Sequence, residues 1–94
     1  MEQSITLNLP YDLPESDWDK VMSVYESMDG WLGNSKEAFW YGNSPGASFI
    51  YVSSEPSGLI VTGNVDEILW VGWVSKLCAK LSFALKREVY DAEM

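Results

Sequence analysis

Few side chains in this 94-residue sequence are of the types that enzymes use as nucleophiles or general bases. The absence of histidine excludes His-containing triads, Cys–His pairs, His metal sites and an imidazole pH switch. The one cysteine, Cys78, falls at the edge of an apolar helical stripe, where a thiol usually packs as a small hydrophobic group. A single cysteine cannot form an internal disulfide, which is typical of a reducing compartment.

Neighbouring carboxylates are the remaining groups that could do acid–base work or bind Ca²⁺ or Mg²⁺. Asp17 with Asp19, and Asp66 with Glu67, are such pairs, but neither follows the spacing of an EF-hand loop. The second pair lies where a helix should begin, and there its charge interacts with the helix dipole. The phosphate-binding and nucleophile-elbow glycine motifs are absent from the sequence. We therefore expect no enzyme activity, no metal and no cofactor.

The net negative charge of the chain limits the kinds of molecule that it can bind. Fourteen acidic and six basic residues give a net charge of −8, which repels nucleic acid and anionic membranes and attracts basic proteins. The first residues lack the features of a secretory signal, and no uninterrupted apolar run approaches the roughly 18 residues of a membrane span. We expect a cytoplasmic protein that binds neither nucleic acid nor membrane.

The spacing of apolar residues predicts the strands that hold these groups. Alternation of apolar and polar residues indicates a strand at 4–11 and a weaker one at 87–93, and a short strand at 37–42 lies between two turn-rich segments. Two β-branched, aromatic-rich runs joined by the sequence EPSG predict a hairpin over 48–63.

Helical spacing predicts two helices. The first runs from about Pro14 to just before Gly30, and the second opens at a capping box formed by Asn64 and Glu67 and ends near residue 85. Each presents one apolar stripe to the core. The first stripe comprises Trp18, Val21, Val24, Tyr25 and Met28, and the second Trp70, Trp73, Val74, Leu77, Leu81 and Leu85.

The predicted element order defines the fold class. Residues 1–94 should form one α+β domain with the order β-α-β-β-β-α-β. That order suggests a two-layer sandwich in which a mainly antiparallel sheet of about five strands carries both helices on one face. It is a variant of the ferredoxin-like plan with an extra strand.

The first candidate site is an acidic stripe on the first helix. Helical projection places Glu15, Asp19, Glu26 and Asp29 within about 80° of one another, opposite the apolar stripe. Such a face would guide a basic partner to the surface, although it could also serve only solubility. Small acidic inhibitors of basic toxins or nucleases, such as bacterial immunity proteins, are similar in size and charge. A non-catalytic protein-binding module of this inhibitor or immunity type is the preferred function.

Two alternatives rest on apolar residues. Ile68, Leu69, Gly72 and Phe83 project away from the core stripe of the second helix, where a loop of the chain or another molecule could cover them. A second copy at this surface would make the protein a structural homodimer. The other alternative is a small-molecule-binding domain with an aromatic cleft lined by Trp40, Tyr41 and Tyr51.

Overall fold

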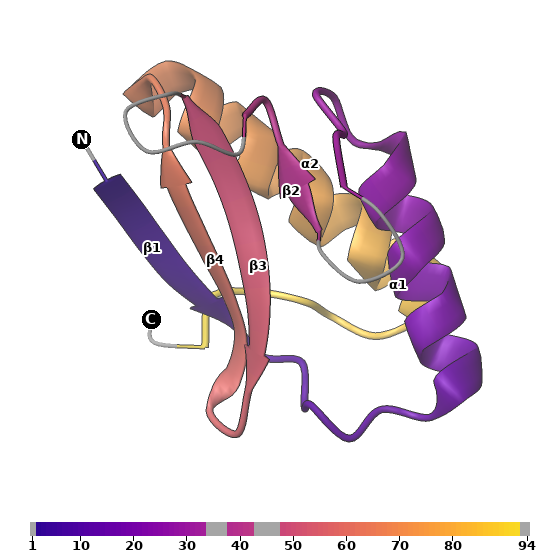
Figure 1. Cartoon of the computed structure of the whole chain (residues 1–94). Coiled ribbons are helices and arrows are strands. Elements are labelled where there is room, and N and C mark those ends of the chain that lie inside the picture. Colours follow the sequence, from indigo (N-terminus) through magenta and orange to yellow (C-terminus); the bar gives the residue numbers. More distant parts are fainter. Residues whose placement is uncertain (1, 34–37, 43–47, 93–94) are drawn as a thin grey trace.

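The structure, a computed structural model, describes residues 2–33, 38–42 and 48–92 (Figure 1). Within these ranges the chain forms an α+β globule with four strands and two helices. The elements in chain order are β1 (Glu2–Leu7), α1 (Glu15–Ser27), β2 (Phe39–Trp40), β3 (Phe49–Glu55), β4 (Gly58–Asn64) and α2 (Glu67–Leu85).

The strands form one sheet with the order β1-β4-β3-β2, in which every neighbouring pair is antiparallel. The hairpin predicted over 48–63 is confirmed, and Pro56 and Ser57 form the turn between β3 and β4. Strand β2 is only two residues long and pairs with β3, so that Trp40 lies opposite Ile50. Strands β1 and β2 are therefore the two edges of the sheet.

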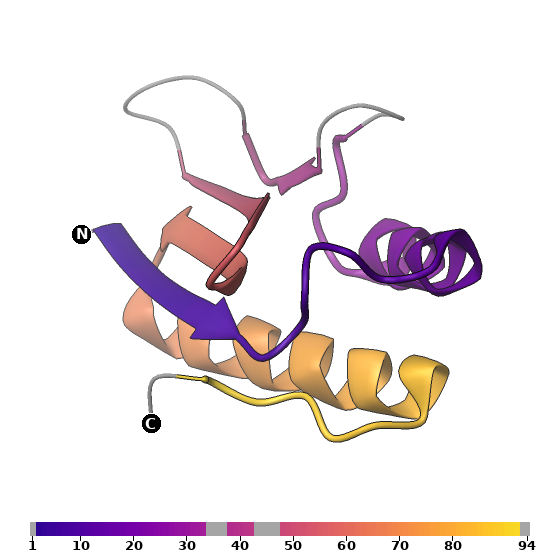
Figure 2. The same cartoon turned by 90° about the horizontal axis from the view of Figure 1, so that it is seen from below.

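The alternation of side chains gives the sheet one face that lies in the core, and both helices pack on that face (Figure 2). Apolar side chains on alternate strand positions point inward, while their neighbours point to the opposite face. The fully buried strand residues are Leu7, Trp40, Ile50, Leu59 and Val61. The same core contains Val21, Val24 and Tyr25 of α1 and Trp70, Trp73, Leu77 and Leu81 of α2.

Trp40 is the centre of the aromatic part of the core. Its ring centroid lies 4.7 Å from that of Trp73, 5.3 Å from that of Tyr25 and 5.4 Å from that of Trp31, in edge-to-face contacts. The buried indole Nε1 donates a hydrogen bond to the Tyr25 carbonyl oxygen at 3.0 Å. These contacts fix the short strand β2 against both helices.

Gly63 sets how closely α2 approaches the sheet. A Cβ atom at this position would lie 2.5 Å from Cζ3 of Trp70, so any larger residue would push the indole away from β4. The absence of a side chain therefore allows the first turn of α2 to pack directly on the sheet.

Individual residues determine where α2 begins and ends. The sequence predicted Asn64 as the N-cap, but Asn64 is the last residue of β4, and the Asp66 carboxylate caps the helix by accepting from the Ile68 backbone N–H at 3.1 Å. The chain bends at buried Val65, so the helix begins only at Glu67. At the other end Lys86 adopts a left-handed conformation with φ 53° and ends the helix.

The predicted fifth strand over 87–93 is wrong for the residues that the structure describes, which form four strands. The segment after α2 instead makes one antiparallel bridge between Asp91 and Leu7 of β1. Hydrogen bonds between Asn8 and Tyr90 accompany it, and buried Val89 anchors the segment in the core. The element order β-α-β-β-β-α therefore lacks the final strand on which the ferredoxin-like comparison depended.

Candidate functional site

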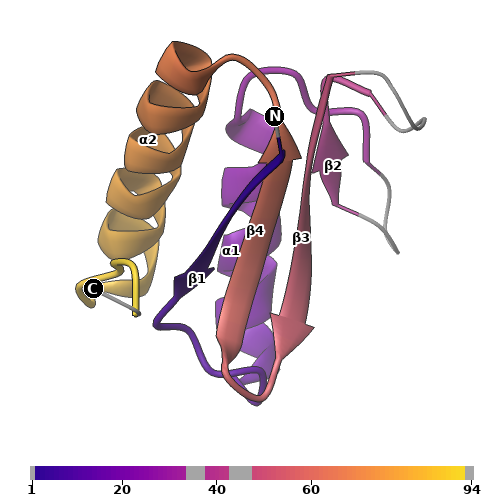
Figure 3. The same cartoon turned by 90° about the vertical axis from the view of Figure 1, so that its left-hand side faces the viewer.

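The side of α2 that faces away from the sheet is apolar and exposed. We call this surface the outer face of α2. In Figure 3 neither α1 nor any of the four described strands lies on the side of α2 that is opposite the sheet. Its large side chains keep much of their area in water: 84% for Ile68, 40% for Leu69, 58% for Val71 and 89% for Phe83. The residues of the outer face are Ile68, Leu69, Val71, Gly72, Ser75, Ala79 and Phe83.

The middle of the outer face is flat because its residues are small. Gly72 is exposed and helical, and a Cβ atom there would meet nothing within 4 Å. Ser75 and Ala79 continue the strip one and two turns along the helix, and both are exposed. Ile68 and Phe83 stand at the two ends of this strip. Another backbone could therefore approach α2 closely between these two large side chains.

Helix α2 has apolar residues both on its inner side, which faces the core, and on its outer face. It has the length and composition of a membrane-spanning helix, with a mean hydropathy of 1.4. Its inner side, however, carries Trp70, Trp73, Leu77 and Leu81, which are buried against the sheet and α1. Packing within the chain thus explains the apolar residues of the inner side. The outer side has no such explanation among the described residues.

A shallow groove between α1 and α2 borders the outer face. Its volume is about 630 Å³, and Phe83, Ala79 and Ala84 line it on the α2 side. Val24 forms part of its apolar lining on the α1 side, and Lys20 adds a positive charge. The C-terminal half of the outer face is therefore continuous with an apolar depression that carries basic groups at its rim.

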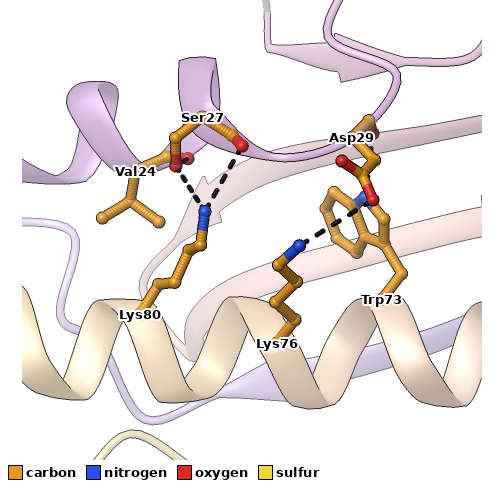
Figure 4. A network of polar contacts seen from close by, with 6 residues as sticks. All are labelled: Val24, Ser27, Asp29, Trp73, Lys76 and Lys80. Carbon is orange, nitrogen blue, oxygen red and sulfur yellow. Dashed lines mark hydrogen bonds and ion pairs between the residues drawn. The ribbon is translucent and has the colours of Figure 1, made fainter.

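Polar contacts hold the two helices together beside this groove (Figure 4). The Lys80 ammonium donates to the Ser27 hydroxyl at 2.9 Å and to the Ser27 carbonyl at 3.3 Å, close to the end of α1. Trp73 Nε1 donates to the Asp29 carbonyl oxygen at 3.2 Å, and the Asp29 carboxylate lies 3.8 Å from the Lys76 ammonium. These contacts fix the position of the groove, although the exposed ion pair adds little stability.

The structure brings together three of the four residues of the predicted acidic stripe. Glu15, Asp19 and Glu26 are exposed on one side of α1. Asp29 does not belong with them, because α1 ends at Ser27 and the chain turns there toward α2. The projection assumed a helix that continued to residue 29. The acidic surface is therefore shorter than predicted.

The structure does not form the predicted aromatic cleft. Trp40 has no exposed area, and Tyr51 lies on the opposite face of the sheet, since it pairs with Phe39 rather than with Trp40. Tyr41 is half-buried, and its ring covers Gly30, where a Cβ atom would lie 2.6 Å from the ring. The three side chains thus point to different surroundings, because neighbouring residues of a strand alternate between faces.

The environment of Cys78 does not activate its thiol. Partial burial, together with the negative charge of Asp91, raises the pKa of this thiol. A raised pKa keeps the sulfur protonated near neutral pH, where the thiol is a poor nucleophile.

All four residues predicted for a self-interface, Ile68, Leu69, Gly72 and Phe83, lie on one exposed surface. Sequence reasoning missed Val71 and Ala79, which extend that surface. It also missed the groove, because only the packing of α1 against α2 creates it. The three-to-four-residue spacing of Ile68, Val71, Gly72, Ser75 and Ala79 was the available signal.

Comparisons with protein-family models, curated proteins and solved structures give no match to this chain. The functional interpretation consequently rests on the surface chemistry described above.

Proposed function

We propose that this protein is a small, non-catalytic protein-binding module that docks through the outer face of α2. The exposure of Ile68, Val71 and Phe83 on one side of one helix is the observation that carries the proposal. Contiguous apolar surface of this kind is uncommon on a free soluble protein and usually marks an interface. Full burial of each such side chain would contribute about 1.5–3 kcal/mol to association.

The position of the surface also favours docking. The inner side of α2 is anchored by four buried side chains, so the outer face is presented by a helix that is already ordered. A partner would therefore not have to bear the entropic cost of forming the helix, which leaves more of the contact energy for binding.

A photo-crosslinking experiment tests this proposal. Phe83 is replaced by benzoylphenylalanine in cells that express the chain, and a matched variant carries the same group at exposed Tyr11, which does not belong to the outer face. We expect crosslinked products from position 83 that are absent at position 11 and are lost when Ile68→Asp is added. Absence of any product at position 83 would contradict docking through this surface.

The acidic residues of α1 support a second candidate, the binding of a basic protein as an inhibitor of the immunity type would bind it. Glu15, Asp19 and Glu26 are exposed on one side, and the described ion pairs involve Asp17 and Asp29 instead. Complementary charge of this kind mainly accelerates association.

Charge reversal at Glu15 and Asp19 tests the second candidate. The double variant Glu15→Lys, Asp19→Lys should slow association with a basic partner about tenfold or more at low salt, and much less at high salt. Glu2→Lys, at an exposed position on β1, serves as the control for a charge change elsewhere. Stopped-flow kinetics would exclude the acidic surface if the double variant associates as fast as the control.

A further inference from the structure

The outer face of α2 has a symmetry that points to its partner. Ile68 and Phe83 lie equally far on either side of the midpoint between Ser75 and Lys76, and so do Gly72 and Ala79. A two-fold axis through this midpoint, perpendicular to the helix, would place the Ile68 of one copy opposite the Phe83 of another. The same axis would place Gly72 opposite Ala79, so large residues meet at the ends and small residues meet in the centre.

The two ends of α2 carry opposite charges, which also fit a two-fold, antiparallel pair. Asp66 and Glu67 are exposed at its N-terminal end, and Lys86 and Arg87 are exposed just beyond its C-terminal end. In an antiparallel pair the acidic end of each helix would lie beside the basic end of the other, and the helix dipoles would also be opposed favourably. A parallel pair would bring like charges together at both ends.

We infer that a second copy of this chain covers the outer face, through an antiparallel α2–α2 contact with two-fold symmetry. This inference rests on the proposed function and specifies its partner. Such an interface is isologous, because the same surface of each copy binds itself. The open space at Gly72 allows the two backbones to approach closely at the centre.

The extent of the surface sets the expected strength. A 19-residue helix is roughly 28 Å long, and one face about 10 Å wide offers roughly 300 Å² per copy, against about 800 Å² in a standard stable interface. The net charge of −8 on each copy also opposes association at low salt. We therefore expect a weak, reversible dimer with a dissociation constant on the order of 10–100 µM.

Sedimentation of the full chain between about 1 µM and 1 mM, a range chosen to bracket that value, tests the dimer. Gly72→Leu should raise the dissociation constant at least tenfold, because its side chain occupies space that is open in the single copy and holds the two helices apart. Ser16→Leu adds the same side chain at an exposed position of α1 and should leave the dimer unchanged. Tighter association of Gly72→Leu would overturn the close helix contact.

Cysteine crosslinking tests the orientation, in a background in which Cys78→Ala removes the native thiol. A mixture of the Gly72→Cys chain and the Ala79→Cys chain should form a mixed disulfide dimer, resolved by mass spectrometry. Gly72→Cys alone should not crosslink, since the two copies of that residue would be separated by seven residues along the pair, roughly 10 Å. Efficient crosslinking of Gly72→Cys alone would overturn the antiparallel arrangement.

The remaining outcomes separate the two proposals. A strict monomer that crosslinks a different protein from position 83 would overturn the dimer but support docking through α2. A monomer that co-sediments with phosphatidylglycerol vesicles through Phe83 would show that a lipid surface covers the face, which contradicts both proposals. A monomer that gives neither product would also contradict both.

Discussion

Helices α1 and α2 pack on the same face of the same sheet, yet they differ in the side that they leave to water. The outer side of α1 carries polar and acidic residues, including Glu15, Asp19 and Glu26, as a helix at the surface of a soluble protein usually does. The outer side of α2 carries Ile68 and Phe83. Because the inner sides of both helices are buried alike, the fold itself does not require this difference. Contact with water explains the polar outer side, whereas the apolar outer side is the surface for which we propose a partner.

The largest expected effect is a difference in the free energy of unfolding between substitutions on the two sides of α2. Leu77→Ala, which truncates a side chain with no exposed area, should lower the free energy of unfolding by about 2–5 kcal/mol. Phe83→Ala, on the outer face, should change it by less than about 0.5 kcal/mol in the dilute monomer. Urea unfolding at low protein concentration measures both. Equal losses would show that the outer face is buried within the chain.

The start of α2 depends on a side-chain cap, whereas the start of α1 has none. Asp66→Ala removes the carboxylate that caps α2 and should cost about 1–2 kcal/mol, while α1 begins at Pro14 without a side-chain cap. Asp66→Asn, which keeps a capping oxygen, should lose much less. Circular dichroism during thermal unfolding would detect this order, and equal losses for the two variants would assign the effect to charge.

The inner side of α1 contains a buried polar group, the hydroxyl of Tyr25. The Tyr25 hydroxyl is buried without a hydrogen-bond partner among the described residues, so Tyr25→Phe should raise the free energy of unfolding by about 1 kcal/mol. Burial raises the pKa of this hydroxyl, whereas in the unfolded chain it ionises near pH 10.

The sign of the Tyr25 effect follows from that shift. Below pH 10 both states hold the proton, and above it only the unfolded state loses it readily, so the wild-type stability falls as the pH rises. Tyr25→Phe should fall less steeply between pH 10 and 12, since it lacks this group. Urea unfolding across that range would reject the assignment if both proteins lose stability equally.

The smallest effect concerns the glycine of the outer face. Gly72→Ala should raise the free energy of unfolding by about 0.5–1 kcal/mol, because alanine favours a helix and its Cβ meets no neighbour within 4 Å. Gly63→Ala, where the added carbon would collide with Trp70, should destabilise the fold instead. Loss of stability in Gly72→Ala would mean that α2 is more crowded there than the structure shows.

Local patterns in the sequence predicted the elements well. The β-branched, aromatic-rich runs of 48–63 and the helical spacing of Trp70, Trp73 and Leu77 are local patterns, so the elements that they predicted are present in the fold. The Asn64 cap failed because β4 extends to that residue and the helix begins only at Glu67. A boundary of this kind depends on how far the strand is paired, which is not a local property.

Features that depend on tertiary contact could not be predicted. Alternation at 87–93 indicated a strand, but only the single bridge to Leu7 forms. The aromatic cleft failed because Trp40 and Tyr51 belong to opposite faces, which only the register of β2 on β3 determines. The outer face of α2 was predicted in part from helical projection, since the direction of Ile68 and Phe83 away from the core stripe is a local property of one helix.

The short pairings at the two edges of the sheet limit how this chain can assemble. Asp91 occupies the edge of β1 at Leu7, and Trp31 occupies that of β2 at Trp40. A strand edge that is covered over part of its length in this way recruits a further strand less easily, and such recruitment is the step that begins fibrous aggregation. The exposed apolar surface with Phe83 lies on a helix instead, and the two-fold contact proposed for it would close after two copies. Removal of residues 88–92 would uncover the β1 edge at Thr6 and Leu7, where the strand of another copy could then pair.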